Sequence, residues 1–212
     1  IFGASGGTQT YNGGLNTASV DGTVTLNGSL VTSDDALTFG AVTLGSATTI
    51  DTNSTTTNRA DITIAAITGG SNALTLTTEN NVTGSDITAS GNISGVTTLT
   101  LASVGGTATL SGDVDVTTLT VGNTVLNVAF TGNGSTVTNS FTPDNDGTFI
   151  FGASGGTQTY NGGLNTASVD GTVTLNGSLV TSNDALTLGA ATLASDVTLT
   201  SAGGAIATGA IT

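Results

Sequence analysis

Apolar residues alternate with threonine in many short segments of this chain, for example at residues 24–26, 37–39, 62–64 and 99–101. Successive side chains of a strand point to opposite sides, so a period of two residues is typical of strands with one buried face. Val, Ile and Thr are also residue types that strands favour. Because no segment shows the 3.6-residue stripe and the caps of a helix, the pattern predicts an all-β fold.

The alternation changes phase at short turn segments. Leu37 and Phe39 share one parity, while Val42 and Leu44 share the other. A corner at residues 40–41 would let both pairs point inward. Gly, Asn, Asp and Ser separate other strand segments, and these residue types are typical of turns. The sequence therefore predicts short strands that are joined by tight corners.

The first 46 residues return almost unchanged later in the chain. Residues 1–46 match residues 150–195 at 42 positions. The four differing pairs are Asp34/Asn183, Phe39/Leu188, Val42/Ala191 and Gly45/Ala194. We therefore divide the chain into one super-repeat, residues 1–149, and the start of the next, residues 150–212, and we expect it to be a window of a longer array.

A shorter period of 20 or 21 residues lies inside the super-repeat. The segment 96–100 recurs unchanged as 116–120, and the offset of 149 residues divides into about seven such units. Stacked units would place each residue over its counterpart, Leu99 over Leu119 for example. With units about 4.8 Å apart, seven of them would span about 34 Å along the axis.

Two all-β architectures fit short strands with many turns. A β-sandwich usually has an aromatic core signature, whereas only 4% of these residues are aromatic. A β-solenoid stacks one coil per short repeat, and the coils together bury a core that no coil could bury alone. We predict a parallel β-helix (β-solenoid) of about ten coils of roughly 21 residues, with an array of β-sandwich domains as the alternative.

The composition excludes several classes of function. The chain of 212 residues has 14 acidic side chains and one basic side chain, Arg59, so its net charge is −13. A single cation leaves no basic patch for nucleic acid. Without Cys or His there is no thiol nucleophile, Ser-His-Asp triad or histidine metal site. No apolar run is long enough to cross a membrane as a helix, and we expect no enzyme activity.

One turn carries oxygen ligands in a pattern that suits calcium. Asp144, Asn145 and Asp146 precede a glycine, as hard oxygen ligands do in calcium-binding loops. The later bidentate glutamate of an EF-hand is missing, so a solvated turn after Pro143 is the alternative. Calcium at this turn is the one cofactor that the residues suggest.

Two kinds of surface chemistry are also encoded. Triplets for N-glycosylation begin at Asn27, Asn53, Asn81, Asn92, Asn133 and Asn176, although a chain rich in Asn, Ser and Thr also produces such triplets by chance. Outward Thr-x-Thr ranks, with Thr98 and Thr100 over their counterparts Thr118 and Thr120, would suit an ice-binding face. Threonine is also a common outward residue of ordinary strands.

The few aromatic residues gather near the junction between the repeat copies. Phe151 and Tyr160 of the second copy correspond to Phe2 and Tyr11 of the first. Exposed aromatic side chains anchor many interfaces, so these four residues are predicted assembly contacts. The alternative is a locally wider core at the junction.

Three runs carry a resemblance to a known class of proteins. Residues 23–28, 36–44 and 96–101 resemble the low-complexity β-strand repeats of large bacterial surface proteins, namely autotransporter passengers and filamentous-haemagglutinin-type adhesins. The resemblance extends over nearly the whole chain. It implies a right-handed parallel β-helix, export to the cell surface, and a role in adhesion or fibre formation.

These observations together predict a structural segment of an extracellular repeat protein that forms a stiff stalk or filament on the cell surface. Open strand edges at the ends of a stack template further pairing, so we expect self-association or end-to-end continuation. We expect no nucleic-acid partner and no transmembrane segment. The alternatives are an adhesin that binds glycans or a host surface through its side face, and an ice-binding solenoid.

Overall fold

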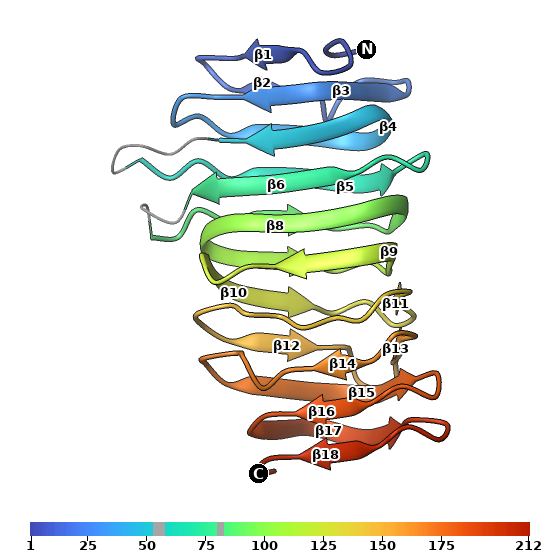
Figure 1. The fold of residues 1–212 in the computed structure, drawn as a ribbon. Coiled ribbons are helices and arrows are strands. Elements are labelled where there is room, and N and C mark those ends of the chain that lie inside the picture. The colour runs from blue at the N-terminus through green and yellow to red at the C-terminus, as the bar shows by residue number, and fades with distance from the viewer. Residues whose placement is uncertain (53–57, 80–82) are drawn as a thin grey trace.

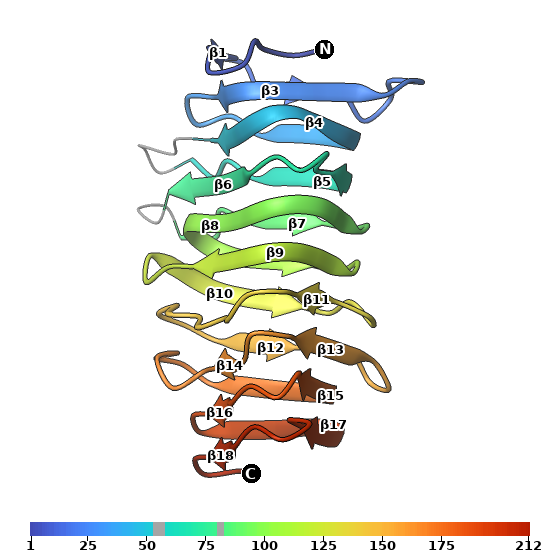
Figure 2. The ribbon, with the colours of Figure 1, turned by 45° about the vertical axis from the view of Figure 1, so that its right-hand side comes forward.

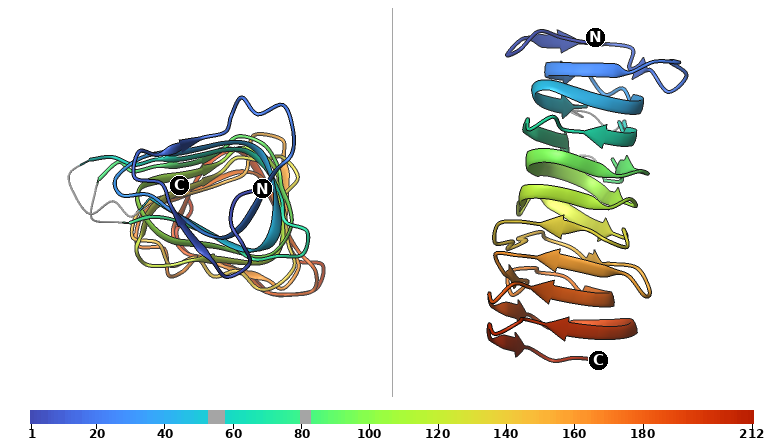
Figure 3. Two further views of the ribbon diagram at one scale, coloured as in Figure 1. Left: turned by 90° about the horizontal axis from the view of Figure 1, so that it is seen from above. Right: turned by 90° about the vertical axis from the view of Figure 1, so that its right-hand side faces the viewer.

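The computed structural model describes residues 1–52, 58–79 and 83–212, whose strands wind into a β-solenoid of about nine turns (Figure 1). Seen along its axis, the stack has a roughly triangular outline (Figure 3). Strands of neighbouring turns pair in parallel, and the described residues contain no helix. The predicted parallel β-helix is therefore confirmed.

Most strands are short, and the two longest ones, Leu37–Asp51 and Ile93–Leu110, bend around corners of the triangle. In chain order they are β1 (Thr8–Thr10), β2 (Leu15–Asn16), β3 (Val24–Val31), β4 (Leu37–Asp51), β5 (Ile62–Thr68), β6 (Leu74–Glu79), β7 (Ile87–Ala89), β8 (Ile93–Leu110), β9 (Val114–Val121), β10 (Val125–Phe130), β11 (Thr136–Val137), β12 (Phe149–Phe151), β13 (Thr157–Tyr160), β14 (Leu164–Asn165), β15 (Val173–Thr181), β16 (Leu186–Leu188), β17 (Ala191–Thr200) and β18 (Ile206–Thr208).

Three faces form the wall, and a column of paired inward residues runs down each face. Face 1 has the column Leu15, Leu37, Ile62, Ile87, Ala108, Val128, Phe149, Val173 and Ala191. Face 2 has the column Val24, Val42, Ile67, Ile93 and Val114. Face 3 has the column Leu30, Ile50, Leu76, Leu101 and Val121. The core is the space that these columns enclose.

Like residues stack on like residues, as the short period predicts. Leu99 pairs with Leu74 in the turn before it and with Leu119 in the turn after it. All three side chains are at most 4% exposed. Each leucine therefore fills the core directly beside a leucine of the next turn.

The corner at residues 40–41 is also confirmed. Leu37 and Phe39 lie on face 1, whereas Val42 and Leu44 lie on face 2. All four side chains are at most 3% exposed. Because β4 bends between the two faces, residues of opposite parity both point into the core.

The turns differ in length, which corrects the expected number of coils. Paired residues are 18 positions apart at Val24 and Val42 but 25 apart at Leu37 and Ile62. The 212 residues therefore make about nine turns, where the shorter period predicts ten.

The two copies of the repeated segment fold alike but lie on different faces. Leu15 pairs with Leu37, and their counterparts Leu164 and Leu186 pair in the same register. The column of face 1, however, runs from Leu15 to Phe149 and never reaches Leu164. The second copy is therefore turned about the axis relative to the first.

The rotation between the two copies equals one face of the triangle. Leu164 pairs with Phe141. Phe141 belongs to face 3, as the hydrogen bond from the nearby N–H of Asp144 to the carbonyl of Val121 on that face indicates. Six steps along face 1 lead from Leu15 to Phe149, and Leu164 lies two faces further along the chain. The super-repeat thus covers about six and two-thirds turns rather than the predicted seven.

Side chains at the corners tie each turn to the next. Asn92 Oδ1 accepts a hydrogen bond from the backbone N–H of Asp113 at 3.0 Å, and Asp113 Oδ1 accepts one from the N–H of Gly134 at 2.7 Å. Asn127 Oδ1 accepts from the N–H of Thr148 at 2.9 Å. Because each bond spans 21 residues, it fixes the register between turns as well as the shape of a corner.

Truncation of a stacked leucine should destabilise the fold far more than truncation of its outward neighbour. We expect Leu99→Ala to lower the free energy of unfolding by about 2–5 kcal/mol, because it leaves a cavity between two leucines. The control Thr98→Ala, on the outer surface of the same strand, should change it by less than about 0.5 kcal/mol. Urea unfolding followed by circular dichroism measures both values, and equal losses would contradict the assigned facing.

Close approach of neighbouring turns makes Gly177 costly to replace. Gly177 has a φ of 72°, and an added Cβ would lie 2.4 Å from the carbonyl oxygen of Gly156. Gly155 has a similar φ of 77° but open space around the Cβ position. Gly155→Ala should cost about 1–2 kcal/mol from backbone strain alone, and Gly177→Ala about 1–3 kcal/mol more from the clash. Thermal unfolding of the two variants tests this order.

Candidate functional site

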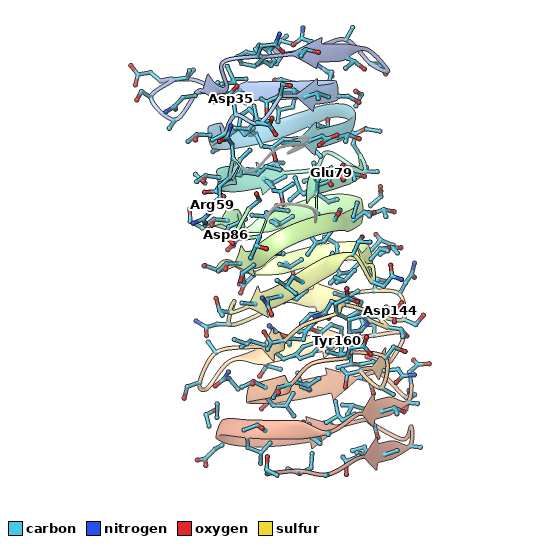
Figure 4. All side chains as sticks on the ribbon, turned by 90° about the vertical axis from the view of Figure 1, so that its left-hand side faces the viewer. Asp35, Arg59, Glu79, Asp86, Asp144 and Tyr160 are labelled. Carbon is cyan, nitrogen blue, oxygen red and sulfur yellow. The ribbon has the colours of Figure 1, made fainter. Side chains whose placement is uncertain are left out.

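The single cation lies beside two carboxylates at a corner of the wall. Arg59 Nη2 is 3.0 Å from Asp86 Oδ2 and 4.0 Å from Asp61 Oδ1, and Figure 4 shows Arg59 and Asp86 next to each other. Asp61 Oδ1 accepts the N–H of Asp86, and Asp86 Oδ1 accepts the N–H of Thr107, both at 2.8 Å. The carboxylates thus brace successive turns, and the half-exposed arginine offsets part of their charge.

The residues of the predicted calcium loop do not converge. Asp144 and Asp146 are exposed on the wall, but Asn145 is fully buried (Figure 4 labels Asp144). The Nδ2 of Asn145 donates to the carbonyls of Gly147 at 3.0 Å and Thr148 at 3.1 Å. Adjacent residues of an extended segment point to opposite sides, which is why the three-ligand set Asp144, Asn145 and Asp146 is not assembled.

A wider search of the described residues finds no group of three or more Asp, Glu, His or Cys side chains that could hold a metal ion. The Oδ1 of Asn145 lacks a hydrogen-bond partner in residues 1–52, 58–79 and 83–212. An ordered water is the usual partner of such a buried oxygen. The aspartates of the wall instead bond backbone N–H groups at the corners.

The predicted glycosylation sites differ in accessibility. Asn92 and Asn133 are exposed, whereas Asn27 and its repeat counterpart Asn176 are half-buried. The amide of Asn27 also lies near the carbonyls of Phe2 and Gly3, at 3.5 and 3.4 Å. Asn53 and Asn81 lie outside the described residues.

Columns of threonine run along the outer wall, but an array of two adjacent threonine columns extends over few turns. Thr98 pairs with Thr118 and Thr100 with Thr120, as predicted. In the turn before, Leu74 pairs with Leu99, which places Ala73 rather than a threonine beside Thr98. The Thr-x-Thr rank thus extends over two turns at this position. One column of four threonines lies on face 1 at Thr38, Thr63, Thr88 and Thr109, and another lies on face 3 at Thr49, Thr75, Thr100 and Thr120.

A shallow groove crosses four turns on face 2. Its polar lining comes from five hydroxyl-bearing side chains and one carboxylate, which are Ser71, Thr97, Thr117, Thr136, Thr138 and Asp115. Hydroxyl and carboxylate groups are hydrogen-bond partners for sugar hydroxyls. The sequence did not reveal this groove, because its residues come from segments that are far apart in the chain and only the coil register brings them together.

An aromatic cluster fills the core at the repeat junction. Its members are Phe130, Phe141, Phe149, Phe151 and Tyr160, each at most 1% exposed. Ring centroids lie 4.1 Å apart for the stacked pair Phe149 and Phe151, and 5.7 Å apart for Phe141 and Tyr160. Rings at these spacings attract one another beyond their burial alone.

The cluster corrects the predicted assembly contacts in the second copy. Phe151 and Tyr160 are 0% and 1% exposed, so their side chains belong to the core and cannot contact another molecule. Their counterparts Phe2 and Tyr11 lie in the first turn and are half-buried. Of the four predicted contacts, only this pair remains partly open to solvent.

A buried polar pair completes the aromatic cluster. Tyr160 Oη donates to Gln158 Oε1 at 2.8 Å, and Gln158 Nε2 donates to the carbonyl of Phe130 at 3.1 Å. Gln158 is 1% exposed, so these bonds satisfy groups that would be costly to bury alone. Sequence reasoning missed Gln158, although its place two residues before Tyr160 puts both side chains on one face.

Burial raises the pKa of the Tyr160 hydroxyl far above its ordinary value of 10.0. An unfolded tyrosine loses its proton near pH 10, while Tyr160 keeps its proton in the folded chain. The free energy of unfolding from this group is therefore intact below about pH 10 and falls as the pH rises further.

The two tyrosines should ionise at different stages of an alkaline titration. In Tyr160→Phe, tyrosinate absorbance from Tyr11 should rise while the chain is still folded, because Tyr11 is half-buried. In Tyr11→Phe, absorbance from Tyr160 should rise only with the loss of the circular dichroism signal. Ionisation of Tyr160 in the folded chain would contradict its burial.

The described residues contain no helix that is long and apolar enough to span a bilayer. Comparison of the chain with protein-family models, curated proteins and solved structures gives no match.

Proposed function

We propose that this chain is a structural segment of an extracellular repeat protein and that it forms a stiff stalk or filament on the cell surface. The observation that carries the proposal is one uninterrupted stack that includes both copies of the repeat. Pairing continues from β10 through β12 into β15, so the second copy follows the first without a break. A linked array of such repeats would form a rod rather than a string of beads.

The wall and the ends of the stack support this role in different ways. Figure 2 shows the two chain ends at opposite ends of the stack. Of the described large apolar side chains that are exposed, only Leu126 lies in the middle of the chain; the others are Ile1, Val20, Leu193, Ile206 and Ile211. Contacts made by burial of the apolar surface of the last turn, at Leu193, Ile206 and Ile211, would therefore form along the axis.

The repeat-like runs and the low charged fraction of the sequence support a long rod on the cell surface. The runs 23–28, 36–44 and 96–101 resemble repeats of bacterial surface proteins of the autotransporter-passenger and filamentous-haemagglutinin type. A charged fraction of 7% limits repulsion between like charges that stack in neighbouring turns. Both features suit a long rod that is built from many similar turns.

An array test follows from the turn count of the super-repeat. Chains with one, two or three extra copies of residues 1–149 placed before the 212-residue chain should lengthen by about 32 Å per copy, since about six and two-thirds turns lie about 4.8 Å apart. Each copy should also rotate by about a third of a turn relative to the one before. Electron microscopy measures both quantities, and arrays that bend freely between copies would contradict a stalk.

The surface location needs an independent test. Antibodies raised against the folded chain should label intact cells of the source organism in immunogold microscopy, at a distance from the cell envelope. A cytosolic protein of the same cells serves as the control that must stay unlabelled. Labelling that requires permeabilised cells would overturn the location without affecting the rod geometry.

The groove on face 2 favours one second function, binding of a glycan. Thr97, Thr117 and Thr138 line it from three successive turns, and their hydroxyl groups would face a sugar chain that lies along the axis. A glycan array probed with the 212-residue chain tests this function, with the variant Thr117→Val as the matched control. Binding that is equal for both proteins, or absent for both, would remove the groove from consideration.

A further inference from the structure

The two copies of the repeated segment provide an internal comparison of a covered and an uncovered turn. Phe151 and Tyr160 in the second copy are 0% and 1% exposed. Phe2 and Tyr11 have the same sequence surroundings but remain half-exposed in the first copy. The difference shows how much of this turn becomes buried when another turn lies above it.

The cover of the second copy comes from one segment, residues 128–149. Phe141, from the turn above, stacks on Tyr160 with ring centroids 5.7 Å apart. Phe149 precedes Phe151 by two residues in β12 and stacks on it at 4.1 Å. The carbonyl of Phe130 accepts the hydrogen bond of the Gln158 amide. The turn above therefore supplies the rings of Phe130 and Phe141 and one acceptor, and the strand that leads into Phe151 supplies the ring of Phe149.

The first copy already has the arrangement that receives such a cover. The rings of Phe2 and Tyr11 meet edge to face at 6.2 Å, against 5.9 Å for Phe151 and Tyr160. Tyr11 Oη donates to Gln9 Oε1 at 2.6 Å, as Tyr160 does to Gln158. Since the receiving side chains are in place before a partner arrives, little ordering would be needed on binding.

We propose that the upper face of the first turn, formed by Phe2, Gln9 and Tyr11, is a docking face for a further copy of the segment 128–149 of this same sequence. The inference rests on the proposed function, since such docking would join consecutive repeats in one stalk. The aromatic cluster is then the joint between repeats. The docked segment would stack its rings on Phe2 and Tyr11 and accept the Gln9 amide through the carbonyl equivalent to that of Phe130.

Two observations favour this occupant over the opposite end of a second molecule. The last turn, residues 191–212, contains no aromatic residue and exposes the aliphatic side chains Leu193, Ile206 and Ile211. It therefore lacks the rings that cover Phe151 and Tyr160. In addition, β1 pairs only with β3, whereas its counterpart β13 also pairs with β11 of the turn above, so one backbone edge of β1 is free for the parallel pairing that β11 makes with β13.

The test places the segment in front of the first turn. Residues 125–149 are added before Ile1 of the Tyr160→Phe chain, which leaves Tyr11 as the only tyrosine in a chain without tryptophan. Acrylamide quenching of Tyr11 fluorescence should be strong without the extension. With the extension it should fall to the low level of Tyr160, which the Tyr11→Phe chain provides as the reference.

The matched control carries the same extension with its three phenylalanines, at the positions of Phe130, Phe141 and Phe149, changed to serine. Quenching of Tyr11 should then return to the level of the chain without an extension. If the phenylalanine extension leaves Tyr11 as accessible as before, the docking face is wrong. If the serine extension protects Tyr11 equally, pairing of any strand suffices and the aromatic specificity is wrong.

Sedimentation velocity of the unextended chain decides between the two occupants. The sedimentation coefficient should not change with protein concentration, and Tyr11 should stay accessible. Concentration-dependent dimers that protect Tyr11 would assign the face to a second molecule and overturn the proposal. These outcomes are independent of the immunogold result, so a failure of the surface location and a failure of the docking face can be told apart.

Discussion

Parallel backbone pairing between successive turns is the constraint on which the rest of this structure depends. It holds each residue of one turn beside a fixed residue of the next, so an inward position is inward through many turns. The column from Leu37 through Ile62 and Ile87 shows the result. Because a turn cannot bury its apolar side chains alone, the pairing and the core stabilise each other and neither exists without the stack.

The unusual composition follows from this constraint. Charged side chains in a column would lie about 4.8 Å from one another, and the chain has only one cation and 14 anions. Where carboxylates do occur at the wall, as at Asp86 and Asp113, they accept backbone N–H groups of the next turn. Glycine is needed where two turns approach closely, as at Gly177. The missing chemistry and the regular architecture thus have a common cause.

The local pattern was sufficient to predict the faces of strands but not the relation between distant turns. The parity change between Phe39 and Val42 revealed a corner, and the recurrence of Val96–Thr100 revealed the pairing of Leu99 with Leu119. The rotation by one face between the repeat copies was not predicted. It depends on the sum of the lengths of all the intervening coils, which are 18 residues long or longer.

Side-chain direction outside the regular strands was the other limit. Asn145 looked like a calcium ligand, because the sequence does not show that its side chain points inward between two outward aspartates. Phe151 and Tyr160 looked like contact residues until the structure placed the rings of Phe141 and Phe149 against them. In both cases the deciding neighbour lies in the same turn or the next one, at a register that only the whole stack defines.

The most direct test of the account is the distance between two outward residues in consecutive turns. The chain has no cysteine, so Thr100→Cys and Thr120→Cys can carry spin labels at defined positions. Parallel stacking puts the two Cα atoms about 4.8 Å apart, and electron paramagnetic resonance of the double-labelled chain should show strong dipolar broadening. A spectrum equal to the sum of the two single-labelled chains would contradict the stacked-turn register from which every other conclusion follows.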